Sequence, residues 1–136
     1  MASKKEKESK SHIPPELQRA VPSCFTDTQG VIISTMNDLP GFRIVRVLGT
    51  IYGQVVRSRN WGADIGALLR SAVGGEIRLF TNMMYSARND AQERLVGECL
   101  QRGGNAIIAM RFDVDALGAW TQVCAYGTAC VVEKIE

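Results

Sequence analysis

RIVRVLGTIYGQVV, Arg43 to Val56, decides the fold class, because apolar residues alternate along it over the length of a long β-strand. The two glycines inside the run predict β-bulges or the close approach of another backbone. An alternative stays open, in which the glycines are turn residues that split the run into two shorter strands. The face that we expect to be apolar consists of Val45, Val47, Gly49, Ile51, Gly53 and Val55.

Further strands are predicted on both sides of this run. VIIST, which begins at Val31, has the composition of a short strand, and DLPG (residues 38–41) has proline and glycine where a tight turn needs them. Near the end of the chain, residues 105–114 and 121–133 are strand candidates joined by the loop DALGAW. A hairpin is the simplest arrangement for that pair.

Two helices are predicted between the long strand and the hairpin. Residues 60–72 have apolar side chains at helical spacing and are followed by Gly74-Gly75, a typical helix end. Residues 76–102 form the longest periodic segment and predict a helix about 40 Å long. The apolar stripe of this second helix is Phe80, Met84, Ala87, Ala91, Leu95 and Cys99.

The predicted fold class is therefore α+β: a single small domain with an antiparallel or mixed sheet and two helices, in the order β-β-α-α-β-β. The domain is expected to cover residues 24–136, because residues 1–23 are charged or proline-containing and form a flexible tail. The sequence has no apolar run long enough to span a membrane and no secretory signal. Four scattered cysteines without a CxxC motif suit reduced thiols, so we expect a cytoplasmic protein.

Charge argues against nucleic acid as a partner. The net charge of +2 comes from the first ten residues, and the remainder carries equal numbers of acidic and basic groups. Beyond residue 10, eleven arginines and only one lysine, Lys134, supply the positive charge. Arginine favours bidentate pairing at a protein interface or anion site, although a general preference for arginine explains the excess equally well.

We expect no enzymatic activity, because the only histidine, His12, lies in the predicted tail and phosphate-binding loops are missing. One group of polar residues has no obvious structural need, and two interpretations stay open for it. It forms either an anion site near a helix N-terminus or, as we favour, a salt-bridge network between subunits. The group consists of Arg57, Arg59, Asn60, Asp64, Arg70, Glu76, Thr81 and Arg88.

The cysteines are the candidate metal ligands. Cys124 and Cys130 share a strand face, but six residues of strand separate them by about 20 Å, too far for one metal ion. A metal site would need copies from several chains or Cys99 from the helix. We favour packing as their role, because a free cysteine behaves as a small hydrophobe. We expect small residues at Val123, Ala125, Gly127, Ala129 and Val131 to receive the long helix, and a mixed face at Gln122, Cys124, Tyr126, Thr128 and Cys130.

Several motifs resemble the YbjQ-like family of small bacterial, archaeal and fungal proteins, which carry a heavy-metal-binding label. The similarity covers residues 31–133 and rests on the runs IISTMNDLPGFRIVRVLGTIYGQVVRSRN, DIGALLRSAVGGEI, ARNDAQERL, GGNAIIAMRFD and AYGTA. Two positions depart from the family pattern: Cys130 replaces an aliphatic residue, and RGGNAI replaces LGANAV. The first departure argues against Cys130 as a ligand shared by the family.

The resemblance implies an α+β domain that forms a ring, a homopentamer or a pair of pentamers, with no assigned catalytic residues. Our first hypothesis is therefore a non-enzymatic oligomer of uncharacterised cellular role that binds a small ligand or ion at subunit interfaces. The alternatives are a soft-metal protein that uses Cys99, Cys124 or Cys130 across chains, and an enzyme or binder for an anionic ligand at the arginine-rich group. No organic cofactor is expected; a metal ion is the one cofactor left open.

Overall fold

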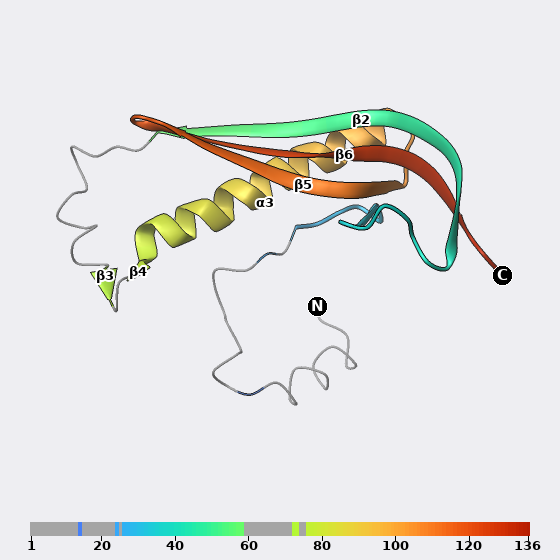
Figure 1. Cartoon of the computed structure of the whole chain (residues 1–136), viewed down its shortest axis with the longest axis horizontal. Helices are drawn as coiled ribbons and strands as arrows, with labels where there is room; N and C mark the ends of the chain where they lie inside the picture. The colour runs from blue at the N-terminus through green and yellow to red at the C-terminus, as the bar shows by residue number, and fades with distance from the viewer. Residues whose placement is uncertain (1–13, 15–23, 25, 59–71, 74–75) are drawn as a thin grey trace.

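A long helix lies across one side of a strongly curved sheet in the computed structural model of the chain (Figure 1). The structure describes residues 14, 24, 26–58, 72–73 and 76–136. The strands pair in the order β1-β5-β6-β2, with β1 parallel to β5 and the other pairs antiparallel, so the sheet is mixed. Its elements are β1 (Ile32–Ile33), β2 (Phe42–Ser58), β3 (Ala72–Val73), β4 (Glu76–Ile77), α3 (Arg78–Gln101), β5 (Ala106–Leu117) and β6 (Trp120–Lys134).

Strand β2 is one continuous strand of 17 residues that pairs with β6 along its whole length. The register shifts twice, between Ile44 and Arg46 and between Val47 and Gly49, and Gly49 has a φ of 108° beside the second shift. The prediction of a bulge is thus confirmed at Gly49, the other shift lies at Val45 away from both glycines, and the alternative of two strands is wrong. Because each bulge changes which side the following residues face, Val47 does not continue the buried face and is 62% exposed.

The second glycine of β2 marks where α3 crosses the sheet. A Cβ atom added at Gly53 would lie 2.5 Å from the backbone oxygen of Ala91 and 2.5 Å from the backbone nitrogen of Leu95. The predicted apolar stripe is confirmed from Ala87 to Cys99, because Ala87, Ala91, Leu95 and Cys99 are all fully buried. Its first two members, Phe80 and Met84, are only partly buried. Small side chains on both elements therefore let the helix backbone approach the sheet.

Strands β5 and β6 form the predicted hairpin, but it is longer than the sequence indicates. Leu117 pairs with Trp120, so most of DALGAW belongs to the strands and only Gly118 and Ala119 remain as the turn. A positive φ at Gly118 alone fits a type II′ turn, which accepts glycine at its first central position. The predicted six-residue loop is wrong because a two-residue turn lets the ladder continue.

The predicted order β-β-α-α-β-β is wrong. The described residues contain one helix, α3, and the segment before it forms a two-stranded sheet in which Val73 pairs with Glu76. Ala72, the predicted end of a helix, is in β3, and α3 begins at Arg78 because β4 occupies residues 76–77. The rest of the predicted helix, residues 60–71, lies outside the described residues, as does the predicted tail apart from Pro14. A Gly-Gly pair is compatible with a hairpin as well as a helix end.

The two sides of the sheet differ in what covers them. We call the side under α3 the inner face; its strand residues are Ile51, Gly53, Val55, Val123, Ala125 and Ala129. The alternate residues of the same strands point to the other side. We call the part of that side formed by Thr50, Tyr52, Gln54, Val56, Gln122, Cys124, Tyr126 and Thr128 the outer face.

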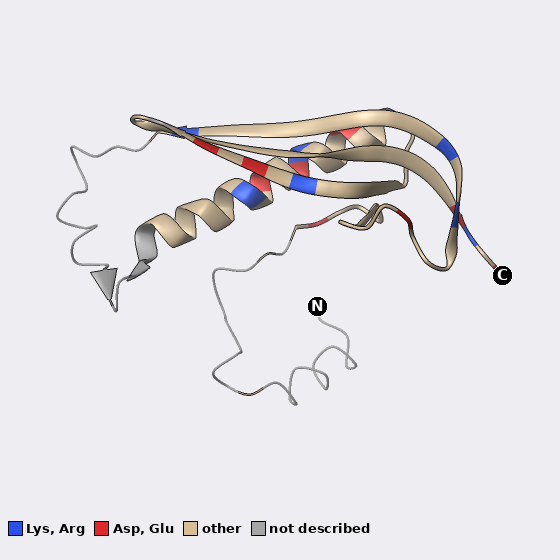
Figure 2. Cartoon of the chain, in the orientation of Figure 1, with Lys and Arg blue, Asp and Glu red and all other residues tan. Residues whose placement is uncertain are grey.

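A second apolar cluster covers the remaining end of that other side. Leu39, from the segment between β1 and β2, packs there with Cys130 and Val132 of β6 and with Ala106 of β5. The expectation for β6 is thus confirmed at Val123, Ala125 and Ala129, whereas Cys130 is buried and leaves the mixed face. Charged residues of both signs are spread over α3 and the strands rather than gathered by sign (Figure 2).

Candidate functional site

The predicted arginine-rich group is divided between two places. Arg57, at the end of β2, forms an ion pair with Asp90 of α3, so it joins sheet and helix. Both side chains are about two-fifths exposed, and the Nε atom of Arg57 is buried with no hydrogen-bond partner in the described part. This pairing supports a structural role for Arg57. Asp90 was not among the predicted residues.

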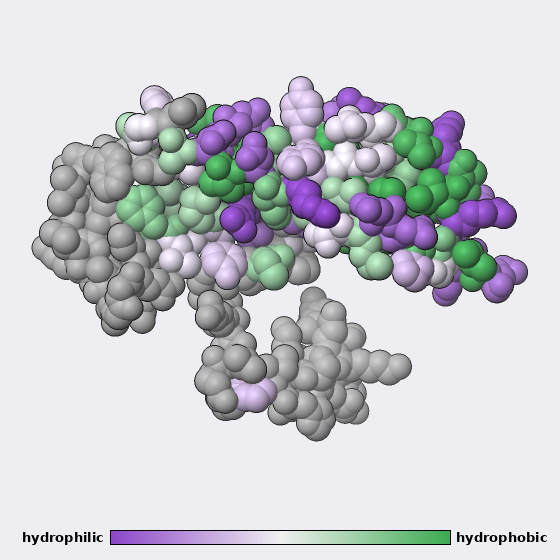
Figure 3. Space-filling view, in the orientation of Figure 1, coloured by the Kyte–Doolittle hydropathy of each residue, from purple (hydrophilic) through white to green (hydrophobic). Residues whose placement is uncertain are grey.

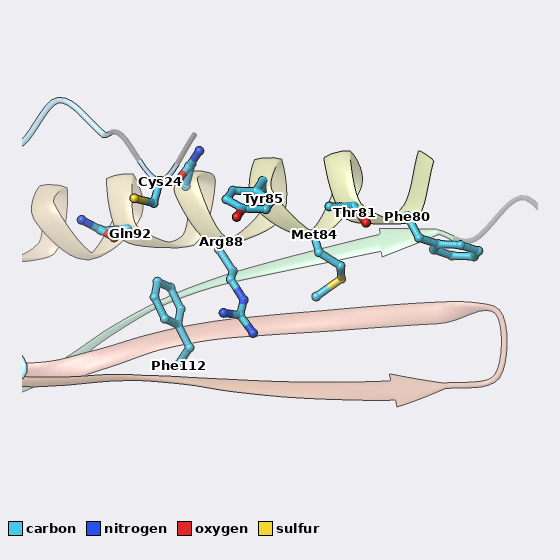
Figure 4. Close-up of a pocket in the computed structure, with 9 residues that line it drawn as sticks. Cys24, Phe80, Thr81, Met84, Tyr85, Arg88, Gln92 and Phe112 are labelled. Atoms are coloured by element: carbon cyan, nitrogen blue, oxygen red, sulfur yellow. The ribbon is translucent and has the colours of Figure 1, made fainter. Parts of the chain in front are cut away.

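Two other members of the group, Thr81 and Arg88, line a cavity of about 540 Å³ between α3 and β5 (Figure 4). The structure therefore brings these two together but places Arg57 with Asp90. Arg59, Asn60, Asp64 and Arg70 lie outside the described residues, and of Glu76 only the backbone, in β4, is described. The cavity is lined by Cys24, Phe80, Thr81, Met84, Tyr85, Arg88, Asn89, Gln92 and Phe112.

The helix contributes most of this cavity wall through one stripe of side chains. Thr81, Tyr85, Arg88 and Gln92 recur at steps of three or four residues, so they share one side of α3. This stripe runs beside the buried apolar stripe and was the signal in the sequence that could have identified the wall. Because Phe112 comes from β5, only the paired fold shows that it faces the helix.

Arg88 and Phe112 make the central contact of the cavity. The guanidinium carbon of Arg88 lies 5.5 Å from the centre of the Phe112 ring, within the range of a cation–π interaction. In Figure 4, Arg88 and Met84 point from α3 toward the hairpin, and Phe112 extends from β5 between hairpin and helix. Met84 and Phe112 are partly buried against the main core. The apolar wall is thus anchored in the core.

The segment before β1 forms the rim of the cavity. The hydroxyl of Thr26 donates to the backbone oxygen of Asn89 over 3.4 Å, which ties this segment to α3. Cys24, two residues earlier, is exposed and lies among the lining residues. The rim therefore carries a free thiol that a reagent in solution can reach.

The predicted metal ligands occupy two different environments, because Cys99 and Cys130 are buried close together and Cys124 lies apart from them. Cys99 and Cys130 are buried, and both thiols donate to the backbone oxygen of Ala106, over 3.6 and 3.7 Å. Burial is the main cause that raises the pKa of both thiols, and the neighbouring Cys130 raises that of Cys99 further. Cys124 is half-buried on the outer face, where burial and then Asp113 raise its pKa.

These donors do not fit a heavy-metal site within one chain. A metal binds the thiolate form, whereas burial holds Cys99 and Cys130 in the neutral form. Among the described residues, no group of three or more histidine, cysteine, aspartate or glutamate side chains gathers closely enough to hold a metal ion. We therefore derive no metal chemistry from Cys99, Cys124 and Cys130.

The fold and cavity define a small α+β domain in which one long helix crosses a mixed sheet. The chain belongs to the YbjQ-like family, described as "Putative heavy-metal-binding", whose family model matches residues 31–133. It is 48% identical over 107 residues to a UPF0145 protein of Acidothermus cellulolyticus, covering 78% of this chain and 99% of that protein. A UPF0145 protein of Pyrococcus abyssi is 43% identical, with 79% and 96% covered.

A solved structure supports the fold. The crystal structure of a protein of unknown function from Pediococcus pentosaceus, assigned to the DUF74 family, superposes with a TM-score of 0.56 and 19% identity. The match covers 77% of this chain and all of that chain. At this identity the similarity shows the fold alone. Within the described ranges, no helix combines the length and apolar character needed to cross a bilayer.

Proposed function

We propose that this protein is a non-enzymatic homo-oligomer whose subunits associate through the outer face. The observation that carries the proposal is the exposure of large side chains on a regular part of the sheet. Tyr52 is 64% exposed, Val56 56% and Tyr126 41%. Tyr52 and Tyr126 are directly paired across β2 and β6, so their rings form one surface. Exposed aromatic groups of this kind are typical of protein interfaces.

The edge of the sheet supports the same proposal. In the strand order of the described sheet, β2 has a neighbour only on its β6 side, so one backbone edge of a 17-residue strand is left unpaired. Such an edge readily pairs with another chain. Beside it, Tyr52, Gln54, Arg94 and Gly97 border a hollow of about 340 Å³ between β2 and α3. A partner side chain has room to enter this hollow.

The space-filling view also shows apolar residues at the surface. Hydrophobic residues gather at the right-hand end, over the region where β2 and β6 bend (Figure 3). Val45 and Val47 of β2 are both more than half exposed. An exposed edge and an exposed face on one strand favour a contact between two different surfaces of neighbouring copies. A contact of that kind forms a ring when the rotation between neighbouring copies closes, and we propose that it closes here.

Ring closure as a homopentamer, or as a pair of pentamers, is the stoichiometry that we take from the family resemblance. Buried free thiols such as Cys99 and Cys130 support a reducing compartment, so we place the oligomer in the cytoplasm. The proposal needs no metal ion and no chemistry beyond assembly.

Sedimentation velocity of the full chain tests the proposal. The wild type is expected to sediment as a complex several times the mass of the 14.9 kDa chain. The double variant Tyr52→Glu with Tyr126→Glu places like charges on the outer face and is expected to sediment as a monomer. Leu100→Glu is the matched control, because Leu100 is an exposed apolar residue on α3. A monomeric wild type, or a double variant that assembles like the control, contradicts the proposal.

A further inference from the structure

We propose that the cavity between α3 and β5 binds a small organic monocarboxylate with a flat apolar body. The inference does not depend on self-association, because the cavity is lined by residues of one chain. Its volume of about 540 Å³ lies within the range of small-molecule sites, roughly 300–1,000 Å³. Such sites combine a mostly apolar wall with a few polar groups, and this cavity has that composition.

Arg88 is the group that recognises an anion. Two nearby arginines are occupied by oxygen atoms: Arg94 of α3 donates to the backbone oxygen of Gln54, and Arg102, just after α3, pairs with Glu98. Arg88 instead lies over the Phe112 ring, and no carboxylate in the described part of the chain is within ion-pairing distance of it. A ring contact orients the guanidinium without neutralising its charge. Arg88 is therefore poised for a carboxylate, which matches the guanidinium geometry with two hydrogen bonds.

The wall selects the rest of the ligand. Phe112 and Met84 are held against the main core, and Phe80 and Tyr85 add aromatic surface. An aromatic or other flat apolar group stacks favourably in such surroundings. Among the described lining residues a single side chain, that of Arg88, is cationic, so a monoanion balances its charge better than a phosphate dianion. Gln92, one turn after Arg88, adds an amide that donates or accepts a hydrogen bond.

Calorimetric titration of the full chain with three probes tests this class of ligand. The probes are 2-naphthoate, which has the charge and the flat body, 2-naphthamide, which lacks the charge, and acetate, which lacks the body. We expect 2-naphthoate to bind at one site per chain and at least about tenfold more tightly than either analogue. Absence of saturable 2-naphthoate binding, or equal affinity for all three, overturns the proposal.

Variants and a labelling experiment locate the binding. Arg88→Gln keeps much of the side-chain size and is expected to weaken 2-naphthoate binding at least about tenfold, to the level of the amide. Arg102→Gln is the matched control, because Arg102 lies just after α3 and does not line the cavity, and it should leave the affinity unchanged. Bound 2-naphthoate is also expected to slow alkylation of the exposed rim thiol, Cys24, by iodoacetamide. Unchanged affinity in Arg88→Gln, or unprotected Cys24 at saturating 2-naphthoate, overturns the assignment.

Discussion

The inner and outer faces are built from alternate residues of the same two strands, yet their residues differ in size and exposure. On β6, Val123 and Ala125 are fully buried under α3, whereas the next residue, Tyr126, points to the other side and is exposed. The inner face needs small residues because the helix backbone lies at van der Waals distance from it, as at Gly53. The outer face carries large residues with nothing in the described chain to cover them. The sheet is thus packed by its own helix on one side and keeps exposed large residues on the other, which is the surface that the proposed association would bury.

The side opposite the helix also changes along its length. At one end Leu39 covers Cys130 and Val132, and these three residues are buried. At the other end Tyr52 and Tyr126 remain exposed. The segment between β1 and β2 therefore covers one end of this side of the sheet. Only the other end, the outer face, keeps exposed large side chains.

Truncating one large residue on each side of the sheet should give the largest difference. Leu95→Ala removes a fully buried side chain of α3 and is expected to lower the free energy of unfolding by about 2–5 kcal/mol. Tyr126→Ala, at an exposed site, should change the folding stability of the dissociated chain by less than about 0.5 kcal/mol. Urea denaturation of dilute protein measures both. An equal loss of unfolding free energy in the two variants would contradict the difference in packing between the inner and outer faces.

Two glycines sharpen the comparison at a smaller scale. Gly53→Ala places a Cβ against the backbone of α3, so it should cost about 1–3 kcal/mol of unfolding free energy. Gly97→Ala is the control within α3, because nothing lies within 4 Å of the added Cβ and alanine favours a helix. It should add up to about 1 kcal/mol. Thermal denaturation gives the sign of each change, and a neutral Gly53→Ala would refute the close approach of helix and sheet.

Alkaline pH should lower the free energy of unfolding gradually. Burial raises the pKa of Cys99 and Cys130 above the ordinary value of 9.0, so the unfolded chain loses these protons first as the pH rises. Stability is therefore constant with respect to these thiols below about pH 9 and falls above it. The variant Cys99→Ala with Cys130→Val removes both groups and should flatten the decline in urea midpoint between pH 8 and 10.5.

The matched control for the alkaline experiment is Cys24→Ser, which changes an exposed thiol. It is expected to retain the full decline of the wild type. A double variant whose urea midpoint falls as steeply as that of Cys24→Ser would show that the buried thiols do not titrate in this way.

Periodicity was enough to predict the elements with long regular patterns. The apolar stripe from Phe80 to Cys99 identified α3, and alternation identified β2, β5 and β6. Strict alternation predicted the wrong side of the sheet for Val47, because two bulges interrupt β2. Only the pairing with β6 shows where these bulges lie. The segment around Ala72 failed because a short apolar run with a Gly-Gly pair fits either a helix end or a hairpin.

The candidate site was predicted only in part for a similar reason. Thr81 and Arg88 were identified from their polarity, but their role depends on what faces α3 across the cavity. Phe112 lies 24 residues after Arg88 in the sequence, and β5 has an irregular register between Ile108 and Arg111. The direction of Phe112 toward the helix therefore could not be obtained by alternation. Local spacing locates one wall of a cavity, whereas long-range pairing supplies the opposite wall.

The reactivity of Cys124 tests the role of the outer face most directly, because this thiol is half-buried there in the single chain. Alkylation by iodoacetamide is measured in a Cys24→Ser background, followed by mass spectrometry of the peptide that contains Cys124. We expect alkylation of Cys124 to be slow in the concentrated protein. We expect it to be faster on dilution and in the variant with Tyr52→Glu and Tyr126→Glu. An alkylation rate of Cys124 that is the same in all three samples would contradict burial of the outer face between subunits.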